Sequence, residues 1–74
     1  MIRYDIFAVK CWEHDQWCFN FMFTTRTAAN KCVADFRYQM ARTGYNLQPT
    51  IVHPAQWVVD AFLAAGNKLD ERKY

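Results

Sequence analysis

The stretch that decides the fold runs from residue 2 to residue 25, IRYDIFAVKCWEHDQWCFNFMFTT. Aromatic and β-branched residues lie on both sides of a single polar cluster, EHDQ at 13–16. Such residues favour strands, and a short polar break between two of these runs is typical of a hairpin. The sequence therefore predicts an antiparallel hairpin whose turn centres on His14 and Asp15.

Counting outward from this turn predicts which residues face each other across the hairpin. The expected pairs are Trp12 with Trp17, Cys11 with Cys18, Lys10 with Phe19, Ala8 with Phe21 and Ile6 with Phe23. Because paired residues share a face, we expect one face to be the core side. With Lys10 as the exception, that face carries Tyr4, Ile6, Ala8, Trp12, Trp17, Phe19, Phe21 and Phe23. A charge at Phe21 is then expected to unfold the chain, and a charge at Met22 is not.

The opposite face of the predicted hairpin is more apolar than a face open only to water should be. Its polar residues are Arg3, Asp5, Asn20 and Thr24. Its apolar residues are Phe7, Val9, Cys11, Cys18 and Met22. We expect these five to be exposed and to bind a partner.

A helix is predicted over residues 28–43. Its apolar residues recur at spacings of three and four and form one stripe, Ala29, Cys32, Val33, Phe36 and Met40. Threonines at 24, 25 and 27 are candidate N-caps, and Gly44 can end the helix. On its polar side Tyr38 lies between Lys31 and Arg42, a mixture common at protein interfaces, so these three join the expected partner-binding residues. The alternative is a solvated face with an ion pair between Lys31 and Asp35.

Residues 45–53 predict a third strand, which Pro49 confines to a sheet edge or makes irregular in its first half. A second helix is predicted from Pro54 to Gly66. Its main stripe is Trp57, Val58, Ala61, Phe62 and Ala65, with Val59 and Leu63 outside it. A right-handed crossover through the first helix gives the strand order 2-1-3. The expected fold class is α+β, β-β-α-β-α, with a three-stranded, mainly antiparallel sheet and the first helix packed on one face.

Length and charge limit what the chain can be. With 74 residues, 53% of them apolar, it should form one domain over 1–66, followed by a charged tail at 67–74 that we expect to fray. The net charge of +2 is too small to indicate nucleic-acid binding by itself, and its basic residues are scattered. No signal peptide or apolar run long enough to span a membrane is present, which predicts a cytoplasmic protein without a membrane partner.

Three metal-capable side chains, Cys11, His14 and Cys18, surround the predicted turn. Zinc sites commonly repeat a pair of closely spaced ligands, and no second pair follows here, so we predict no metal site and no cofactor. A disulfide between Cys11 and Cys18 stays an open alternative. The chain has no serine, Cys32 lies on the predicted buried stripe, and His53 precedes Pro54. We therefore predict no catalytic residues and no enzyme activity.

These observations favour a small non-enzymatic module that binds a protein, or a second copy of itself as a homodimer, by occupying a surface. By analogy of size alone, we expect a viral protein, an inhibitor from a phage or mobile element that acts on a host defence or transcription complex. The first alternative is a small nucleic-acid-binding domain, and the second is a metal- or redox-responsive protein that uses Cys11, His14 and Cys18.

Overall fold

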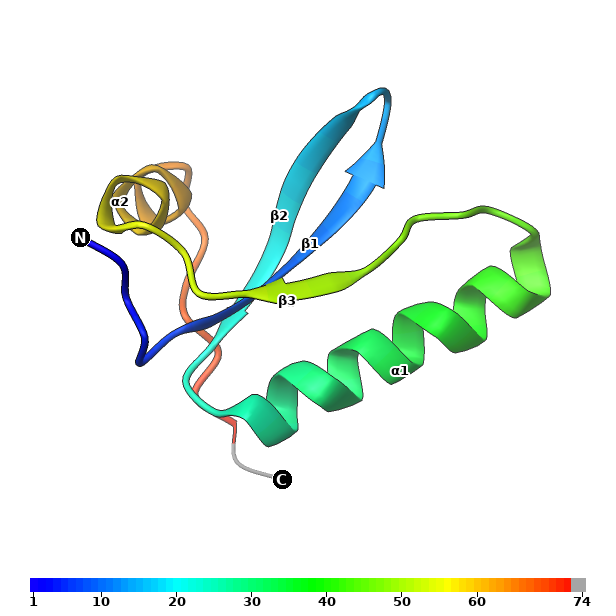
Figure 1. The fold of residues 1–74 in the computed structure, drawn as a ribbon, viewed down its shortest axis with the longest axis horizontal. Helices are drawn as coiled ribbons and strands as arrows, with labels where there is room; N and C mark the ends of the chain where they lie inside the picture. Colours follow the sequence, from blue (N-terminus) through cyan, green and yellow to red (C-terminus); the bar gives the residue numbers. More distant parts are fainter. Residues whose placement is uncertain (73–74) are drawn as a thin grey trace.

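The computed structural model describes residues 1–72. The chain forms β1 (Phe7–Glu13), β2 (Gln16–Phe23), α1 (Arg26–Thr43), β3 (Thr50–Val52) and α2 (Gln56–Ala64) (Figure 1). The sheet order is β2-β1-β3, and β1 is antiparallel to both neighbours. The predicted α+β class, element order and strand order are confirmed. Within residues 1–72 no helix is both long and apolar enough to cross a membrane.

The turn between β1 and β2 lies where the sequence placed it. His14 and Asp15 both have positive φ, 51° and 63°, as a two-residue turn that matches the twist of the strands requires. Glu13 pairs with Gln16 next to the turn. The predicted pairs Trp12 with Trp17, Cys11 with Cys18 and Lys10 with Phe19 are confirmed.

A β-bulge at Asn20 changes the pairing further from the turn. Lys10 pairs with Phe19, but the next residue of β1, Val9, pairs with Phe21, so Asn20 is the extra residue of β2. Ala8 consequently pairs with Met22 and Phe7 with Phe23. The predicted pairs Ala8 with Phe21 and Ile6 with Phe23 are wrong, because one inserted residue moves every following side chain of the strand to the other face.

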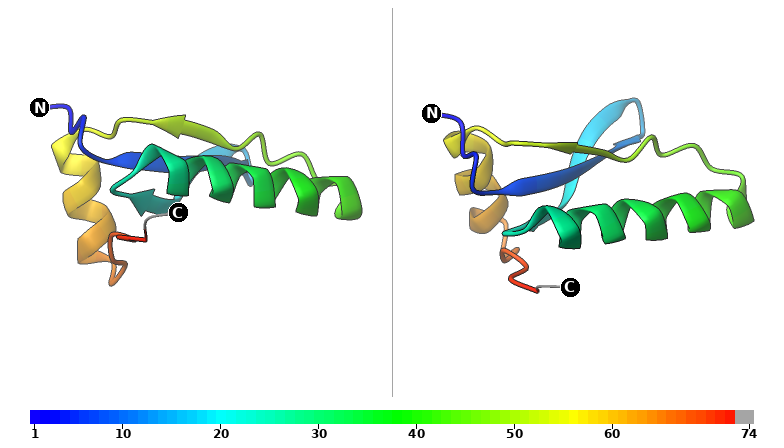
Figure 2. Two further views of the ribbon diagram at one scale, coloured as in Figure 1. Left: turned by 90° about the horizontal axis from the view of Figure 1, so that it is seen from below. Right: turned by 60° about the horizontal axis from the view of Figure 1, so that its bottom comes forward.

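Both faces of the sheet are covered at the end remote from the turn. On one face β1 and β2 pack against α1, in a buried cluster of Val9, Phe23, Ala28, Ala29 and Val33. On the other face they pack against α2, in a buried cluster of Ile6, Ala8, Met22, Val59 and Phe62. Figure 2 shows α1 running along the sheet and α2 crossing one end of it. The prediction of a single core face is therefore wrong, because the alternating residues of each strand serve two separate helices.

α1 begins two residues earlier than predicted. The Thr25 side chain caps it by accepting a hydrogen bond of 3.2 Å from the backbone N–H of Ala28. The helix ends at Gly44, which has a φ of 79° and donates its backbone N–H to the carbonyl of Met40. A residue with a side chain would be strained in this left-handed conformation.

The third strand is much shorter than predicted. Only Thr50–Val52 pairs with β1, and residues 44–49 have no regular structure. Gln48 has a φ of 50° and precedes Pro49, which accounts for the late start. The irregular segment is held by Leu47, whose carbonyl accepts the Trp12 backbone N–H at 2.6 Å.

α2 is positioned by the N-terminal residues of the chain. It begins at Gln56, after Pro54, and has no side-chain cap. The backbone N–H of Gln56 donates to the Met1 carbonyl at 2.7 Å, and that of Arg3 donates to the Pro54 carbonyl at 2.8 Å. Residues 1–3 therefore run beside the start of α2 and replace the missing cap.

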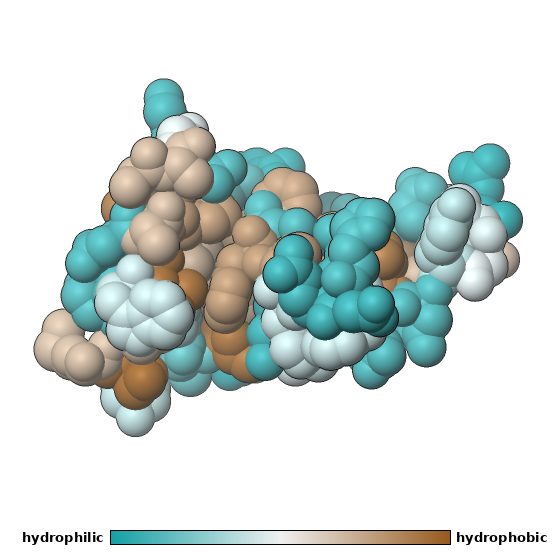
Figure 3. Space-filling view, turned by 90° about the horizontal axis from the view of Figure 1, so that it is seen from above, coloured by the Kyte–Doolittle hydropathy of each residue, from teal (hydrophilic) through white to brown (hydrophobic). Residues whose placement is uncertain are grey.

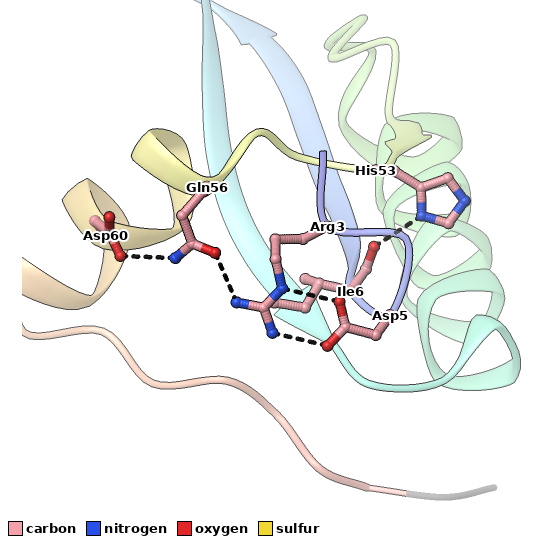
Figure 4. Close-up of polar contacts among 6 residues, drawn as sticks. All are labelled: Arg3, Asp5, Ile6, His53, Gln56 and Asp60. Carbon is pink, nitrogen blue, oxygen red and sulfur yellow. Dashed lines mark hydrogen bonds and ion pairs between the residues drawn. The ribbon is translucent and has the colours of Figure 1, made fainter. Parts of the chain in front are cut away.

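A polar network on the same side reinforces this contact (Figure 4). The Arg3 guanidinium donates to Gln56 Oε1 at 2.9 Å and forms an ion pair with Asp5 at 2.7 Å. Gln56 donates in turn to Asp60 at 2.9 Å. This ion pair lowers the pKa of Asp5, chiefly through the hydrogen bond from Arg3. These groups join the N-terminal segment to α2.

Part of the charged tail is anchored to β2. The Asp70 backbone N–H donates to the Met22 carbonyl at 2.8 Å, and the Asp70 carbonyl accepts the Thr24 N–H at 3.2 Å. Leu69 packs against the cluster under α2. These contacts place Leu69 and Asp70 against the domain, and fraying of the tail stays a prediction. Residues 73–74 of the predicted tail lie outside the described residues.

Candidate functional site

Three of the residues predicted to bind a partner are fully buried. Val9 and Cys11 point toward α1, and Met22 lies under α2; none has measurable exposed surface. The expectation of an exposed outer face is wrong, because α1 covers one side of the hairpin and the bulge turns Met22 toward α2. These three residues contribute to the core, and they are out of reach of any partner while the domain is folded.

The other predicted partner-binding residues lie apart from one another. Phe7 and Cys18 are half-buried on the α1 side of the sheet. Lys31, Tyr38 and Arg42 are exposed on α1, where the Arg42 guanidinium lies 5.8 Å from the Tyr38 ring. The structure therefore brings Tyr38 and Arg42 together on the helix but does not join them to the hairpin residues.

All three cysteines are free thiols, and within residues 1–72 no three His, Cys, Asp or Glu side chains form a metal-binding group. Burial raises the pKa of the Cys11 thiol, partly offset by a hydrogen bond with Asn20. Burial also raises the pKa of Cys32 to about 11. A thiol with a raised pKa is a poor nucleophile at neutral pH because little thiolate is present.

We expect iodoacetamide to alkylate Cys18 first at neutral pH. Cys18 lies on the edge strand and is partly accessible, whereas Cys11 is buried and the raised pKa values of Cys11 and Cys32 suppress their thiolates. Peptide mass spectrometry over a time course checks the order of modification. Modification of Cys11 as early as Cys18 would contradict the burial described above.

The uncovered part of the sheet lies near the turn, on the α2 side. α2 covers the end with Ala8 and Met22, and Phe19 packs half-buried against that cluster. Lys10, Trp12 and Trp17 lie beyond it, toward the turn, on the same face as Phe19. We call these four residues the turn-end face. The Trp12 and Trp17 rings meet edge to face with centroids 5.3 Å apart, and the Lys10 ammonium lies 4.5 Å from the Trp17 ring. Trp12 and Trp17 are 36% and 41% exposed.

Apolar surface continues from this face onto α2. Trp57 is 73% exposed, and a shallow groove lies between it, Phe19 and Phe62. In Figure 3 brown and tan residues gather over the side of the molecule that holds α2, whereas the far end of α1 is mostly teal and white. The sequence placed Trp57 on the main apolar stripe of its helix and Trp12 and Trp17 in the core. Lys10 is the one charged residue on the predicted core face of the hairpin. It was the signal in the sequence that the end of this face near the turn is exposed to solvent.

A second apolar hollow lies on the α1 side of β2. It has a volume of about 220 Å³ and is lined by Phe21, Cys32 and Phe36, with Lys31, Asp35 and Arg72 among the other lining residues. Phe21 is 41% exposed and its ring lies 6.0 Å from Phe23 and 6.1 Å from Phe36. The thiol of Cys32 faces this hollow, and burial raises its pKa to about 11, so little thiolate is present at neutral pH.

Positive charge is concentrated on α1, on the opposite side of the sheet from the turn-end face. The helix carries four exposed cations, Arg26, Lys31, Arg37 and Arg42, and one acid, Asp35. The turn-end face carries only Lys10. Aromatic groups and cations are thus separated by the thickness of the sheet.

No family model, curated protein or solved structure matches this chain.

Proposed function

We propose that the chain is a non-enzymatic protein-binding module that acts by occupying an apolar surface of another protein with its turn-end face. The observation that carries this proposal is the position of the aromatic face and the cationic helix on opposite sides of the sheet. A cytoplasmic setting, in which the three free thiols stay reduced, is part of the proposal, as is action as an inhibitor from a phage or mobile element.

The composition of the turn-end face supports a protein partner. Tryptophan is enriched among the residues that dominate protein–protein binding energy, because it buries a large rigid area and can still donate a hydrogen bond. Trp12, Trp17 and the neighbouring Trp57 present three such side chains on one side of the molecule. Lys10, held over the Trp17 ring, adds one charge at this surface.

Nucleic-acid binding is supported less well by the same surfaces. Stacking platforms for single strands place cations beside the aromatic rings, so that bases and phosphates are bound together. Here the four cations of α1 lie across the sheet from Trp12 and Trp17. One strand could not contact both sets at once without passing round the edge of the sheet.

The substitution Trp12→Lys tests this proposal. Trp12 lies on the central strand, so the change alters the face without touching either sheet edge. The immobilised wild-type chain, Trp12→Lys and the matched control Tyr38→Lys are compared for what they retain from nuclease-treated extract of the source cell. We expect a protein that the wild type and the control retain equally and that Trp12→Lys retains at least tenfold less, since a central tryptophan is typically worth about 2 kcal/mol or more.

Two results would count against the proposal. If Trp12→Lys and Tyr38→Lys reduce the amount of retained protein equally, the turn-end face is not the binding surface. Retention of RNA or DNA, in extract without nuclease, that is lost with Arg42→Glu would favour the nucleic-acid alternative through α1.

A further inference from the structure

The outer edge of β2 is uncovered near the turn. β2 is an edge strand, and among residues 1–72 the tail bonds to its outer backbone groups at Met22 and Thr24, through Asp70. The turn end of the hairpin projects beyond both helices (Figure 1). Within the described part of the chain, residues 16–21 therefore present a free edge.

The pairing with β1 fixes which backbone groups point outward from this edge. Pairs that exchange hydrogen bonds alternate with pairs that do not, starting from the hydrogen-bonded pair that closes a two-residue turn, here Glu13 with Gln16. The N–H and C=O of Trp17 and Phe19 consequently point away from β1, and those of Cys18 point toward it. The bulge shifts this alternation by one residue, so beyond it the backbone groups of Met22 and Thr24 point outward. Both residues bond to Asp70 there.

This edge lacks two of the features by which proteins prevent strand pairing. Edge strands of monomers are commonly blunted by charged residues or proline. β2 has the sequence QWCFNFMF, with no charge and no proline in eight residues. Its bulge lies at Asn20, beyond the free outward groups of Trp17 and Phe19.

We propose that two copies of this chain pair through their β2 edges, antiparallel, about a two-fold axis at Cys18. This register is the one that uses both outward-facing residues, since it sets Trp17 against Phe19 of the second copy and closes four backbone hydrogen bonds. Centring the axis on Phe19 instead would leave Trp17 opposite the bulged region.

The side chains are self-complementary in this register. Trp17 lies opposite an aromatic ring, Gln16 lies opposite the neutral Asn20, and Cys18 lies opposite its own copy. A strand without charges brings no like charges together when it pairs with itself.

The turn of the second copy would come next to the tail in this register. His14 and Asp15 of the second copy fall opposite Met22 and Phe21, beside the point where Asp70 bonds to the edge. A broad depression of about 640 Å³ lies there, bounded by residues 67–72 of the tail. The pairing joins the two turn-end faces into one continuous aromatic surface, because both copies present the α2 side in the same direction.

The test is sedimentation equilibrium over a range of concentrations, with three chains. The wild type should show a monomer–dimer equilibrium, and Cys18→Ala should stay within about threefold of it. Cys18→Lys should raise the dissociation constant at least tenfold, because two ammonium groups would meet at the axis. A wild-type chain that stays monomeric throughout overturns the dimer, as does a dimer that Cys18→Lys leaves intact.

Thiol cross-linking gives an independent readout of the register. In the variant with Cys11→Ala and Cys32→Ala, diamide should oxidise two Cys18 thiols to one intermolecular disulfide, taking up the two electrons and two protons. A dimer by sedimentation without this cross-link would contradict an axis at Cys18. Trp12→Lys should leave the dimer intact, so failure of the dimer and failure of the proposed binding function are distinguishable.

Discussion

Met22→Asp should leave the chain unfolded in buffer, whereas Phe21→Asp should still fold. Met22 is fully buried among Ile6, Val59 and Phe62, while Phe21 is 41% exposed. Removing a buried Met side chain costs about 2–5 kcal/mol, and an unpaired carboxylate there adds several more. At roughly 0.05–0.15 kcal/mol per residue, the free energy of unfolding of a 74-residue chain is only about 4–11 kcal/mol. The first substitution therefore removes the whole stability.

Phe21→Asp loses the ring contacts with Phe23 and Phe36 but leaves its carboxylate in water. We expect a loss of about 1–2 kcal/mol, in the range of ordinary substitutions. Urea unfolding followed by circular dichroism measures both variants. The opposite order, a folded Met22→Asp and an unfolded Phe21→Asp, is what the unbulged pairing predicts and would show that the bulge at Asn20 is absent.

Deleting residues 67–74 should destabilise the domain by about 2–6 kcal/mol. The deletion removes Leu69 from the cluster under α2 and the two backbone hydrogen bonds of Asp70 to β2. It also removes Asn67, whose amide donates to the Phe62 carbonyl at the end of α2. Partial burial of a leucine is worth about 1–2 kcal/mol, and each hydrogen bond about 0.5–1.5 kcal/mol.

The matched control for this deletion is Lys68→Ala, which changes an exposed residue of the same segment. Its midpoint in urea should stay close to that of the wild type. A deletion variant as stable as the full chain would mean that the tail is frayed, as the sequence alone predicts.

The fold was predictable where local rules decide it. A two-residue polar turn fixes the register next to it, which is why the pairs from Glu13–Gln16 to Lys10–Phe19 follow from counting. The first helix follows from one apolar stripe, a threonine cap and a glycine end. The crossover rule then sets the strand order.

The bulge was not predictable because no local signal marks it. Asn20 is a polar residue in an aromatic strand, which fits an exposed position of a regular strand equally well. One extra residue decides whether Phe21 or Met22 enters the core under α2. The division of the sheet between two helices depends on long-range packing, which sequence periodicity does not report.

The candidate site was predictable only in kind. A surplus of apolar residues on the hairpin indicates an interaction surface. The predicted position of that surface depended on the predicted strand register, so it was wrong where the register was wrong. Trp12, Trp17 and Trp57 resemble core residues in sequence. The limited reach of α2 leaves Trp12 and Trp17 exposed, and Trp57 lies on an outer side of α2 itself.

The most direct test of the central claim is the salt dependence of binding to the molecule that the wild-type chain retains. Burial of aromatic side chains on a protein surface predicts an affinity that changes less than tenfold between roughly 50 and 200 mM salt. Phosphate contacts by the four cations of α1 would instead lower it roughly 100-fold, because each releases about one counterion. The predicted result is binding that depends weakly on salt and that is lost in Trp12→Lys. A steep loss of affinity with salt would contradict it.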